Sequence, residues 1–287
     1  MMSSLPTSEL ENQIPAMRRL QRLDSGGQKD VYVGEHTEFG RAVLKVTRQA
    51  GAERALREVE AVKALSSPHV PQIFDVGTLT AAGGPFLYLV EQYVSGRTLR
   101  DVLRERGRLE VGESIELLGA LLETAAAMEQ VRIVHRDIKP ENIMCDDDGA
   151  IWLLDFGIAR ALDLPSLTDT DARFGPHTGG YAAPEQFRNR KLEVDTRADL
   201  FSIGVVTYEA LSGTNPFRED ARSPLEVLTR TESVVLPPLR LPGDSQAQLS
   251  GLIAVLCDRY LSRRPPTAKT ALDWFVAMRP TIQLEEE

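Results

Sequence analysis

The sequence predicts an α+β fold with a strand-rich first part and a mainly helical second part. Between about Arg18 and Gln92, short apolar or β-branched runs follow turn residues, which is typical of strands. After Ser95-Gly96, longer stretches rich in leucine and alanine take over. This change in residue pattern indicates two parts of different architecture within one chain of 287 residues.

The first part is predicted to contain several strands and one helix. The strand candidates are Val31–Val33, Ala42–Val46 and Phe86–Val90. Residues Ala52–Leu65 place apolar side chains on one side when spaced at about 100° per residue, which predicts an amphipathic helix. Glu58 falls at the edge of the apolar stripe and is the acid on this helix best placed to point inward.

The second part is predicted to be built from helices. Two short apolar runs, Arg132–Val134 and Ile151–Leu154, flank the polar turn Asp146–Gly149. The helices are expected at residues 114–130, 200–211, 224–231, 248–260 and 269–278.

Composition and charge narrow the class of protein. The chain is 42% hydrophobic and 26% charged, as is ordinary for a globular protein, and its net charge of -9 argues against a nucleic-acid or anionic membrane surface as main partner. Cys145 and Cys257 lack metal-ligand spacing, which favours buried thiols in a reducing compartment. With neither a secretory signal nor an apolar span visible, a cytoplasmic chain is expected.

The densest chemical signal is His135–Asn142, followed by the D-F-G triplet that begins at Asp155. Phosphoryl transfer needs a divalent metal held against the phosphates, a carboxylate beside the attacking hydroxyl, and positive charge. Asn142 and Asp155 offer the oxygen ligands that Mg²⁺ prefers. Asp137 could orient a hydroxyl and accept its proton, and Lys139 could neutralise the transferred group.

With these motifs the chain resembles the protein kinase family, whose H-R-D-x-x-x-x-N and D-F-G patterns are matched without substitution. The resemblance implies a two-lobed fold, with an antiparallel sheet and one helix in the N-lobe, a mainly helical C-lobe, and ATP in the cleft. The expected boundaries are an N-terminal extension over 1–17, a kinase domain over 18–279 and an acidic tail over 280–287. Within the domain, the N-lobe spans about 18–91, the hinge about 92–95 and the C-lobe about 96–279.

The resemblance also assigns roles to single residues. Lys45 takes the place of the family's phosphate-binding lysine, and Glu58 that of the acid that pairs with it. Asp137 and Lys139 are the other catalytic residues, while Asn142 and Asp155 bind Mg²⁺, or alternatively Mn²⁺. The residues implied to bind ATP and its metal are Gly26, Gly27, Val31, Val43, Lys45, Glu91, Gln92, Tyr93, Val94, Asn142, Met144 and Asp155.

Other motif residues are implied to be structural. Asp199 resembles the family's buried aspartate that braces the catalytic-loop backbone, and Arg264 resembles the arginine that holds the glutamate of the A-P-E motif, here Glu185. His135 is interpreted as a packing residue and not as a base.

The resemblance extends to serine/threonine-specific members of bacterial type. Lys139 and Thr178 match that class, and the protein itself is an expected substrate. Arg136 resembles the arginine that receives an activation-loop phosphate. Autophosphorylation is therefore predicted among Ser166, Thr168 and Thr170.

The chain departs from the family pattern at three places. In the phosphate-covering loop only Gly26 keeps its register, with Gly27 beside it and Lys29 in place of the third glycine. Val43 replaces the usual alanine and narrows the adenine pocket. Glu91 replaces a bulky apolar residue just before the hinge.

A partly buried carboxylate at Glu91 is costly unless it is paired, so a donor such as Lys45 or a water is expected beside it. If Glu91 competes with Glu58 for Lys45, the resting enzyme would be held inactive; this is a hypothesis.

Three alternative functions fit the sequence less well than a protein kinase. A pseudokinase would share the fold without transferring phosphate, and the irregular glycine loop and Glu91 favour it. A small-molecule phosphotransferase generally lacks the A-P-E and D-x-x-S-x-G motifs that are present here. A nucleic-acid-binding module conflicts with the net charge. The expected partners are protein substrates, with no nucleic acid and no membrane segment; the oligomeric state is not indicated.

Overall fold

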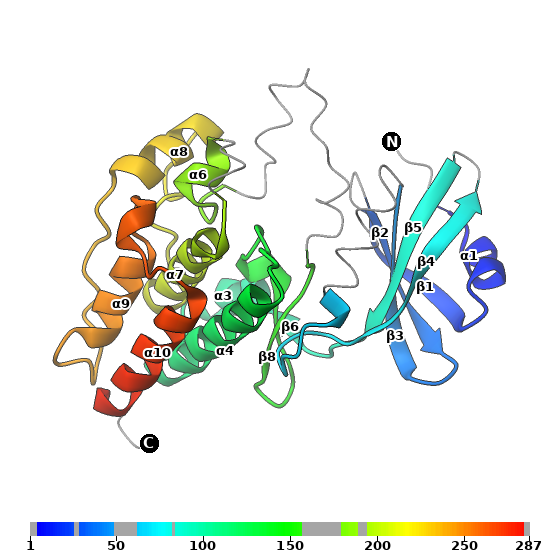
Figure 1. The fold of residues 1–287 in the computed structure, drawn as a ribbon, viewed down its shortest axis with the longest axis horizontal. Helices are drawn as coiled ribbons and strands as arrows, with labels where there is room; N and C mark the ends of the chain where they lie inside the picture. The colour runs from blue at the N-terminus through cyan, green and yellow to red at the C-terminus, as the bar shows by residue number, and fades with distance from the viewer. Residues whose placement is uncertain are drawn as a thin grey trace. The chain divides into compact units, whose positions relative to one another are not determined.

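The computed structural model describes residues 5–25, 29–48, 62–81, 84–156, 179–188 and 194–283. The chain divides into two compact units (Figure 1). The first contains the described residues up to Ser66 and Pro71–Ser95, and the second contains Ser67–Val70, Gly96–Phe156 and the described residues from Gly179 onward.

The first unit is built on a five-stranded antiparallel sheet. In the order β1-β2-β3-β5-β4, its strands are β1 (Met17–Ser25), β2 (Lys29–His36), β3 (Gly40–Arg48), β5 (Gly84–Gln92) and β4 (Ile73–Ala81). The predicted strand runs lie within β2, β3 and β5. Of the predicted helix over Ala52–Leu65, Val62 and Lys63 are helical, and residues 52–61 lie outside the described residues.

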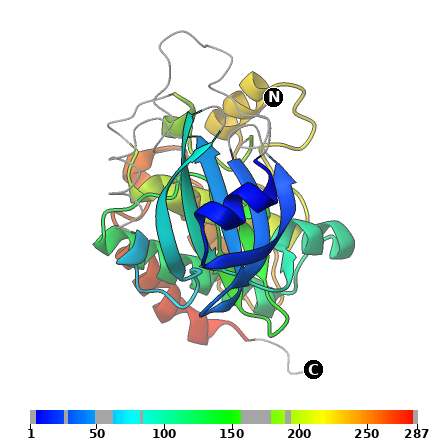
Figure 2. The same ribbon diagram turned by 90° about the vertical axis from the view of Figure 1, so that its right-hand side faces the viewer.

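Helix α1 (Thr7–Gln13) covers one face of this sheet (Figure 2). Leu10 and Ile14 are buried in the same apolar cluster as Leu44 and Val90, whose side chains leave the sheet on that face. The Gln13 side chain adds hydrogen bonds to both the backbone N–H and the carbonyl of Thr80 on the edge strand β4, at 3.2 and 2.9 Å. The described part of the N-terminal extension, from Leu5 onward, therefore contributes apolar side chains to the core of the first unit.

The second unit is mainly helical. Its α-helices are α3 (Leu99–Arg106), α4 (Val111–Gln130), α6 (Pro184–Phe187), α7 (Thr196–Ser212), α8 (Pro224–Ser233), α9 (Gln248–Leu256) and α10 (Ala268–Met278). Short 3-10 turns occur at η1 (Pro140–Asn142), η2 (Leu261–Arg263) and η3 (Arg279–Thr281). Helix α7 runs through the centre, and nearly all of its residues are buried.

A small antiparallel sheet, ordered β6-β7-β8, positions the motif residues of the second unit. Its strands are β6 (Arg97–Thr98), β7 (Ile143–Cys145) and β8 (Ile151–Leu153). Gly96 precedes β6 with φ of +117°, and a Cβ there would lie 2.2 Å from the carbonyl oxygen of Cys145. Only glycine allows β6 to approach β7 in this way.

Three predicted helix boundaries were wrong by three or four residues. Helix α4 begins at Val111 and not at residue 114, and α7 begins at Thr196 and not at residue 200. The helix expected over residues 248–260 ends at Leu256, and Cys257 is its C-cap. Beyond it, the N–H of Tyr260 donates to Oδ1 of Asp258 at 2.8 Å and not to a helical carbonyl, and the carbonyl of Asp258 accepts from Nε of Arg264 at 2.7 Å. Helices α1, α3 and α6 were not predicted.

The packing of α1 gives a test of stability. Leu10→Ala removes a fully buried side chain from the sheet-covering cluster and should destabilise the protein by about 2–5 kcal/mol, the usual cost of such a cavity. The matched control Asn12→Ala changes an exposed residue of the same helix. Thermal melting of both variants measures the difference, and equal melting temperatures would show that α1 does not stabilise the sheet.

Candidate active site

In the first unit, four predicted site residues project from one face of the sheet. Val31 pairs with Lys45 across β2 and β3, and Val43 pairs with Glu91 across β3 and β5. Because directly opposed residues share a face and side chains alternate along a strand, all four side chains lie on one side. This is the face opposite to the one covered by α1, since α1 packs on Leu44 and its neighbours.

Lys45 and Glu91 form an ion pair on this face. Nζ of Lys45 lies 2.5 Å from Oε1 of Glu91, and the two side chains are only 15% and 11% exposed. The expectation that Glu91 meets a donor such as Lys45 is therefore confirmed. Glu58, the other acid expected at Lys45, lies outside the described residues, as do Gly26 and Gly27.

The segment expected to form the hinge follows β5. Gln92 ends the strand, and its N–H donates to the carbonyl of Gln72 at 2.8 Å. The guanidinium of Arg41 lies over the ring of Tyr93, 4.0 Å from the ring centre, and Val94 is almost fully buried. These contacts fix the backbone of residues 92–94 against the sheet.

In the second unit, the loop with the H-R-D-x-x-x-x-N motif, His135–Asn142, is anchored by a buried carboxylate; it is called the catalytic loop after its role in the family. Asp199 on α7 is fully buried and accepts hydrogen bonds from the backbone N–H groups of His135 and Arg136, at 2.7 and 2.8 Å. Burial raises the pKa of Asp199 to about 6, against the opposing effect of those two hydrogen bonds. The bracing role implied for Asp199 is confirmed. It also explains how Arg136 is held at φ of 66°, which is unfavourable for a residue with a Cβ.

The loop brings Asp137, Lys139 and Asn142 together. Nζ of Lys139 donates to Oδ2 of Asp137 at 2.9 Å, and Nδ2 of Asn142 donates to the same oxygen at 3.1 Å and to the Asp137 carbonyl at 2.8 Å. The Asp137 carboxylate is thus held in one orientation by a cation and an amide. Since the amide nitrogen of Asn142 faces Asp137, its amide oxygen is the atom that could bind a cation.

Asp155 is positioned next to Asn142 through the backbone. The carbonyl of Asn142 accepts a hydrogen bond from the N–H of Leu154 at 2.8 Å, which places Asp155 one residue away. Asp155 has φ of 62°, so the chain turns sharply at this residue. A carboxylate and an amide oxygen suit Mg²⁺, which takes few protein ligands and completes its shell with phosphate and water. The described residues contain no cluster of three or more acidic, histidine or cysteine ligands, so a metal cage made of protein alone is not formed there.

His135 is a packing residue, as interpreted from the sequence. Its ring packs edge-on against Phe156 with centres 5.0 Å apart. Its Nδ1 lies 3.3 Å from the backbone N–H of Asp137, and Nε2 lies 2.9 Å from the carbonyl of Leu154. Both ring nitrogens are therefore bound by backbone groups. Met144, the residue expected under the adenine, lies on β7 opposite Trp152 and is half-buried.

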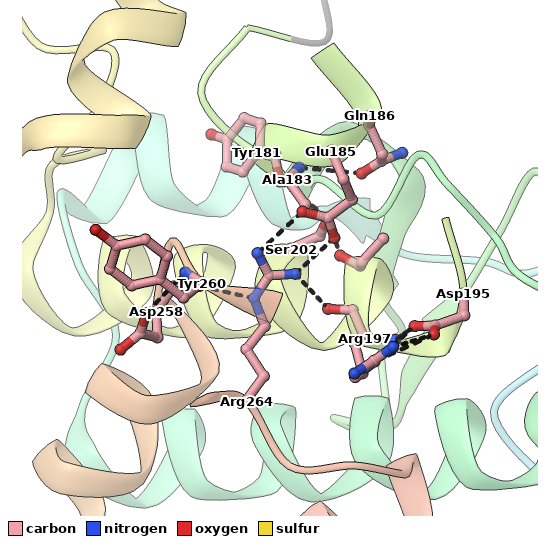
Figure 3. Close-up of polar contacts among 11 residues, drawn as sticks. Tyr181, Ala183, Glu185, Gln186, Asp195, Arg197, Ser202, Asp258, Tyr260 and Arg264 are labelled. Carbon is pink, nitrogen blue, oxygen red and sulfur yellow. Dashed lines mark hydrogen bonds and ion pairs between the residues drawn. The ribbon is translucent and has the colours of Figure 1, made fainter. Parts of the chain in front are cut away.

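The A-P-E segment is tied down by Arg264, as implied by the family resemblance (Figure 3). The guanidinium donates to Oε1 and Oε2 of Glu185, at 2.7 and 3.1 Å, and its side chain is 0% exposed. It also donates to the carbonyls of Arg197 and Asp258. A bidentate pair with two further acceptors uses most of the donors of one guanidinium.

The segment around Glu185 also contacts the catalytic loop directly. Nε2 of Gln186 donates to the carbonyl of Arg136 at 3.0 Å, and Oγ of Ser202 donates to the carbonyl of Tyr181 at 2.9 Å. The loop and this segment are therefore fixed to each other and to α7. Ser166, Thr168, Thr170 and Thr178 lie outside the described residues.

A buried polar cluster that the sequence did not indicate centres on Arg100. Arg100 donates to Glu141 and to Glu209, each at 2.9 Å, and also to the hydroxyl of Tyr181, which in turn donates to Glu209. Burial and the Glu209 charge raise the pKa of Tyr181, so its hydroxyl remains a donor. The cluster joins α3, η1, α7 and the A-P-E segment. Its members lie far apart in sequence, and no local spacing signals it.

The two-lobed combination of sheet and helices, with this catalytic loop, is the architecture of a protein kinase domain. A family model described as "Protein kinase domain" matches residues 19–275, and the chain belongs to this family. In the described residues, no helix is long and apolar enough to cross a membrane.

Curated relatives from bacteria cover most of this chain. Serine/threonine-protein kinase pkn2 of Myxococcus xanthus is 37% identical over 280 residues, which are 92% of this chain and 32% of that protein. Serine/threonine-protein kinases PknB of Mycobacterium leprae and Mycolicibacterium smegmatis are 33% and 35% identical, covering 87% and 86% of this chain and 44% and 40% of those proteins. The chain thus spans between about a third and less than a half of the lengths of these relatives.

The Arg264–Glu185 pair gives a second prediction. Arg264→Lys keeps the charge but cannot bond both carboxylate oxygens and two carbonyls at once. We expect a loss of stability of about 3–5 kcal/mol, the cost of breaking a buried pair, visible as a lower melting temperature. Arg263→Lys, at the exposed neighbouring position, is the control. A melting temperature equal to that of the control would contradict a stabilising role.

Proposed function

We propose that this chain transfers the γ-phosphate of ATP, with Mg²⁺ or Mn²⁺, to serine or threonine hydroxyls of protein substrates. The observation that carries the proposal is the Asp137 carboxylate, held by Lys139 and Asn142 on a loop that is itself fixed by Asp199. A rigid carboxylate beside a cation is what a substrate hydroxyl needs in order to be oriented and to lose its proton.

Each remaining site residue has a proposed role. Asn142 and Asp155 would hold the metal, which when bound neutralises the phosphate oxygens. Lys45 would bind the α- and β-phosphates, with Glu58 as its expected acidic partner. Lys139, whose ammonium already contacts Asp137, would stabilise the negative charge on the transferred group. The adenine and ribose would contact Val31, Val43, residues 91–94 and Met144, and the backbone at Gly26 and Gly27 would contact the phosphates.

We further propose that residues 18–279 form the catalytic domain, with protein substrates that include the chain itself. The sequence argues against the pseudokinase alternative, because the residues required for transfer are present: Lys45, Asp137, Asn142 and Asp155.

A phosphoryl-transfer assay with radiolabelled ATP, Mg²⁺ and a generic protein substrate tests the activity. Asp137→Ala should lower the rate by about 10²–10⁴-fold, the usual contribution of a positioned acid–base group, and Asp155→Ala should abolish metal-dependent transfer. Asp147→Ala, which removes an exposed acid of the β7–β8 turn, should retain the wild-type rate. Equal rates in wild type and Asp155→Ala would support the pseudokinase alternative.

Autophosphorylation is a separate prediction. After incubation with Mg²⁺ and ATP, mass spectrometry should find phosphate on one or more of Ser166, Thr168 and Thr170, and none in the Asp137→Ala protein. A phosphate there would carry about -1.5 to -2 charges and could pair with an arginine such as Arg136, which is exposed. Full activity with all three residues unmodified would contradict the prediction.

A further inference from the structure

The ion pair between Lys45 and Glu91 occupies the lysine to which phosphate binding is assigned. Nζ and Oε1 are 2.5 Å apart, and both side chains are more than four-fifths buried. The pair is formed entirely within the sheet of the first unit, between neighbouring strands β3 and β5. It arises because the chain carries a carboxylate at residue 91, where the family commonly has an apolar side chain.

The strand register shows in which direction the Lys45 ammonium is drawn. Lys45 itself is opposite Leu89, whereas Glu91 is opposite Val43, so the pair is diagonal and points back along β3. The end of β1 at Ser25 and the start of β2 at Lys29 lie the other way: Lys29 is opposite Thr47, two residues beyond Lys45. Glu91 therefore draws the ammonium away from the end of β3 that lies beside Lys29.

Glu91 depends on the Lys45 ammonium for charge compensation. An ammonium is a compact point charge, and a carboxylate with little access to water depends on it for compensation. A nucleotide phosphate that approaches Lys45 must share the same cation with Glu91. The free energy needed to break or share the Lys45–Glu91 pair therefore weakens the binding of nucleotide phosphates. The base and the ribose do not bind this cation, so their binding is not weakened.

We propose that Glu91 sets the affinity of this protein for nucleotide phosphates by competing with them for the Lys45 ammonium. The inference rests on the proposed function only in taking Lys45 as the phosphate-binding lysine. Glu91 is then an affinity-determining residue, and its effect must scale with the presence of phosphate on the ligand.

Binding of adenosine, ADP and ATP with Mg²⁺ to the wild type and to Glu91→Gln, measured by calorimetry, tests this. Glutamine keeps the size of the side chain and removes its charge. We expect ADP and ATP to bind about tenfold more tightly to Glu91→Gln, which corresponds to about 1.4 kcal/mol, and adenosine to bind within about twofold of the wild type.

Two controls isolate the interaction. Glu35→Gln makes the same change in charge on the same sheet, at an exposed carboxylate that pairs with Arg19, and should leave the affinities unchanged. In a Lys45→Met background, Glu91→Gln should change ADP affinity much less than in the wild type, because the cation for which Glu91 and phosphate compete is gone. If Glu91→Gln does not fold, as judged by its melting curve, Glu91→Met, with an apolar side chain of the family's type, takes its place in the same titrations.

The outcomes separate the inference from the proposed function. Weaker ADP binding to Glu91→Gln would show that Glu91 positions Lys45 for phosphate, and an equal change for adenosine would show that it acts on the base; either overturns the inference. A protein that binds as expected but transfers no phosphate would refute only the proposed function. A protein that transfers phosphate with unchanged affinities in Glu91→Gln would refute only the inference, and failure of both proteins to bind ADP would refute the inference and the ATP dependence.

Discussion

The carboxylate of Asp199 holds the arrangement of the second unit together. It is fully buried on the central helix α7, and two backbone N–H groups of the catalytic loop are its hydrogen-bond donors. Because these donors belong to His135 and Arg136, the loop is fixed immediately before Asp137. The left-handed backbone at Arg136 and the orientation of Asp137 toward Lys139 and Asn142 are maintained from this one point.

Three buried acids in this protein are compensated in three different ways, and the difference suits their roles. Asp199 is met by backbone N–H groups, and Glu185 by the two-pronged guanidinium of Arg264, which is fixed by two carbonyls as well. Both arrangements are rigid and serve the scaffold. Glu91 is met by the ammonium of Lys45, a point charge on a flexible stem that can exchange partners. The exchangeable pair contains the lysine that is proposed to bind the nucleotide phosphates.

Sequence reasoning succeeded where a local pattern carries the information. Strands β2, β3 and β5 and most helices of the second unit follow from apolar periodicity, and Asp199, Glu185 and Arg264 were assigned correctly from their motifs. It failed where the cause is remote. Helix α1 is short and mostly polar and is stabilised by the sheet it covers. The roles of Glu58, of Gly26 and Gly27, and of the predicted phosphorylation sites Ser166, Thr168 and Thr170 remain predictions.

The sequence by itself determined the family and the order of the motifs, and it predicts the residues of the site, because each depends on residue types at fixed spacing along the chain. Only the tertiary structure decided which charges meet. Arg100, Glu141, Glu209 and Tyr181 come together from four separate segments, and Glu91 reaches Lys45 through the register of two strands that are separated in sequence by residues 49–83. Such pairs form because a buried charge must find compensation within reach in space, and distance along the sequence does not enter that requirement.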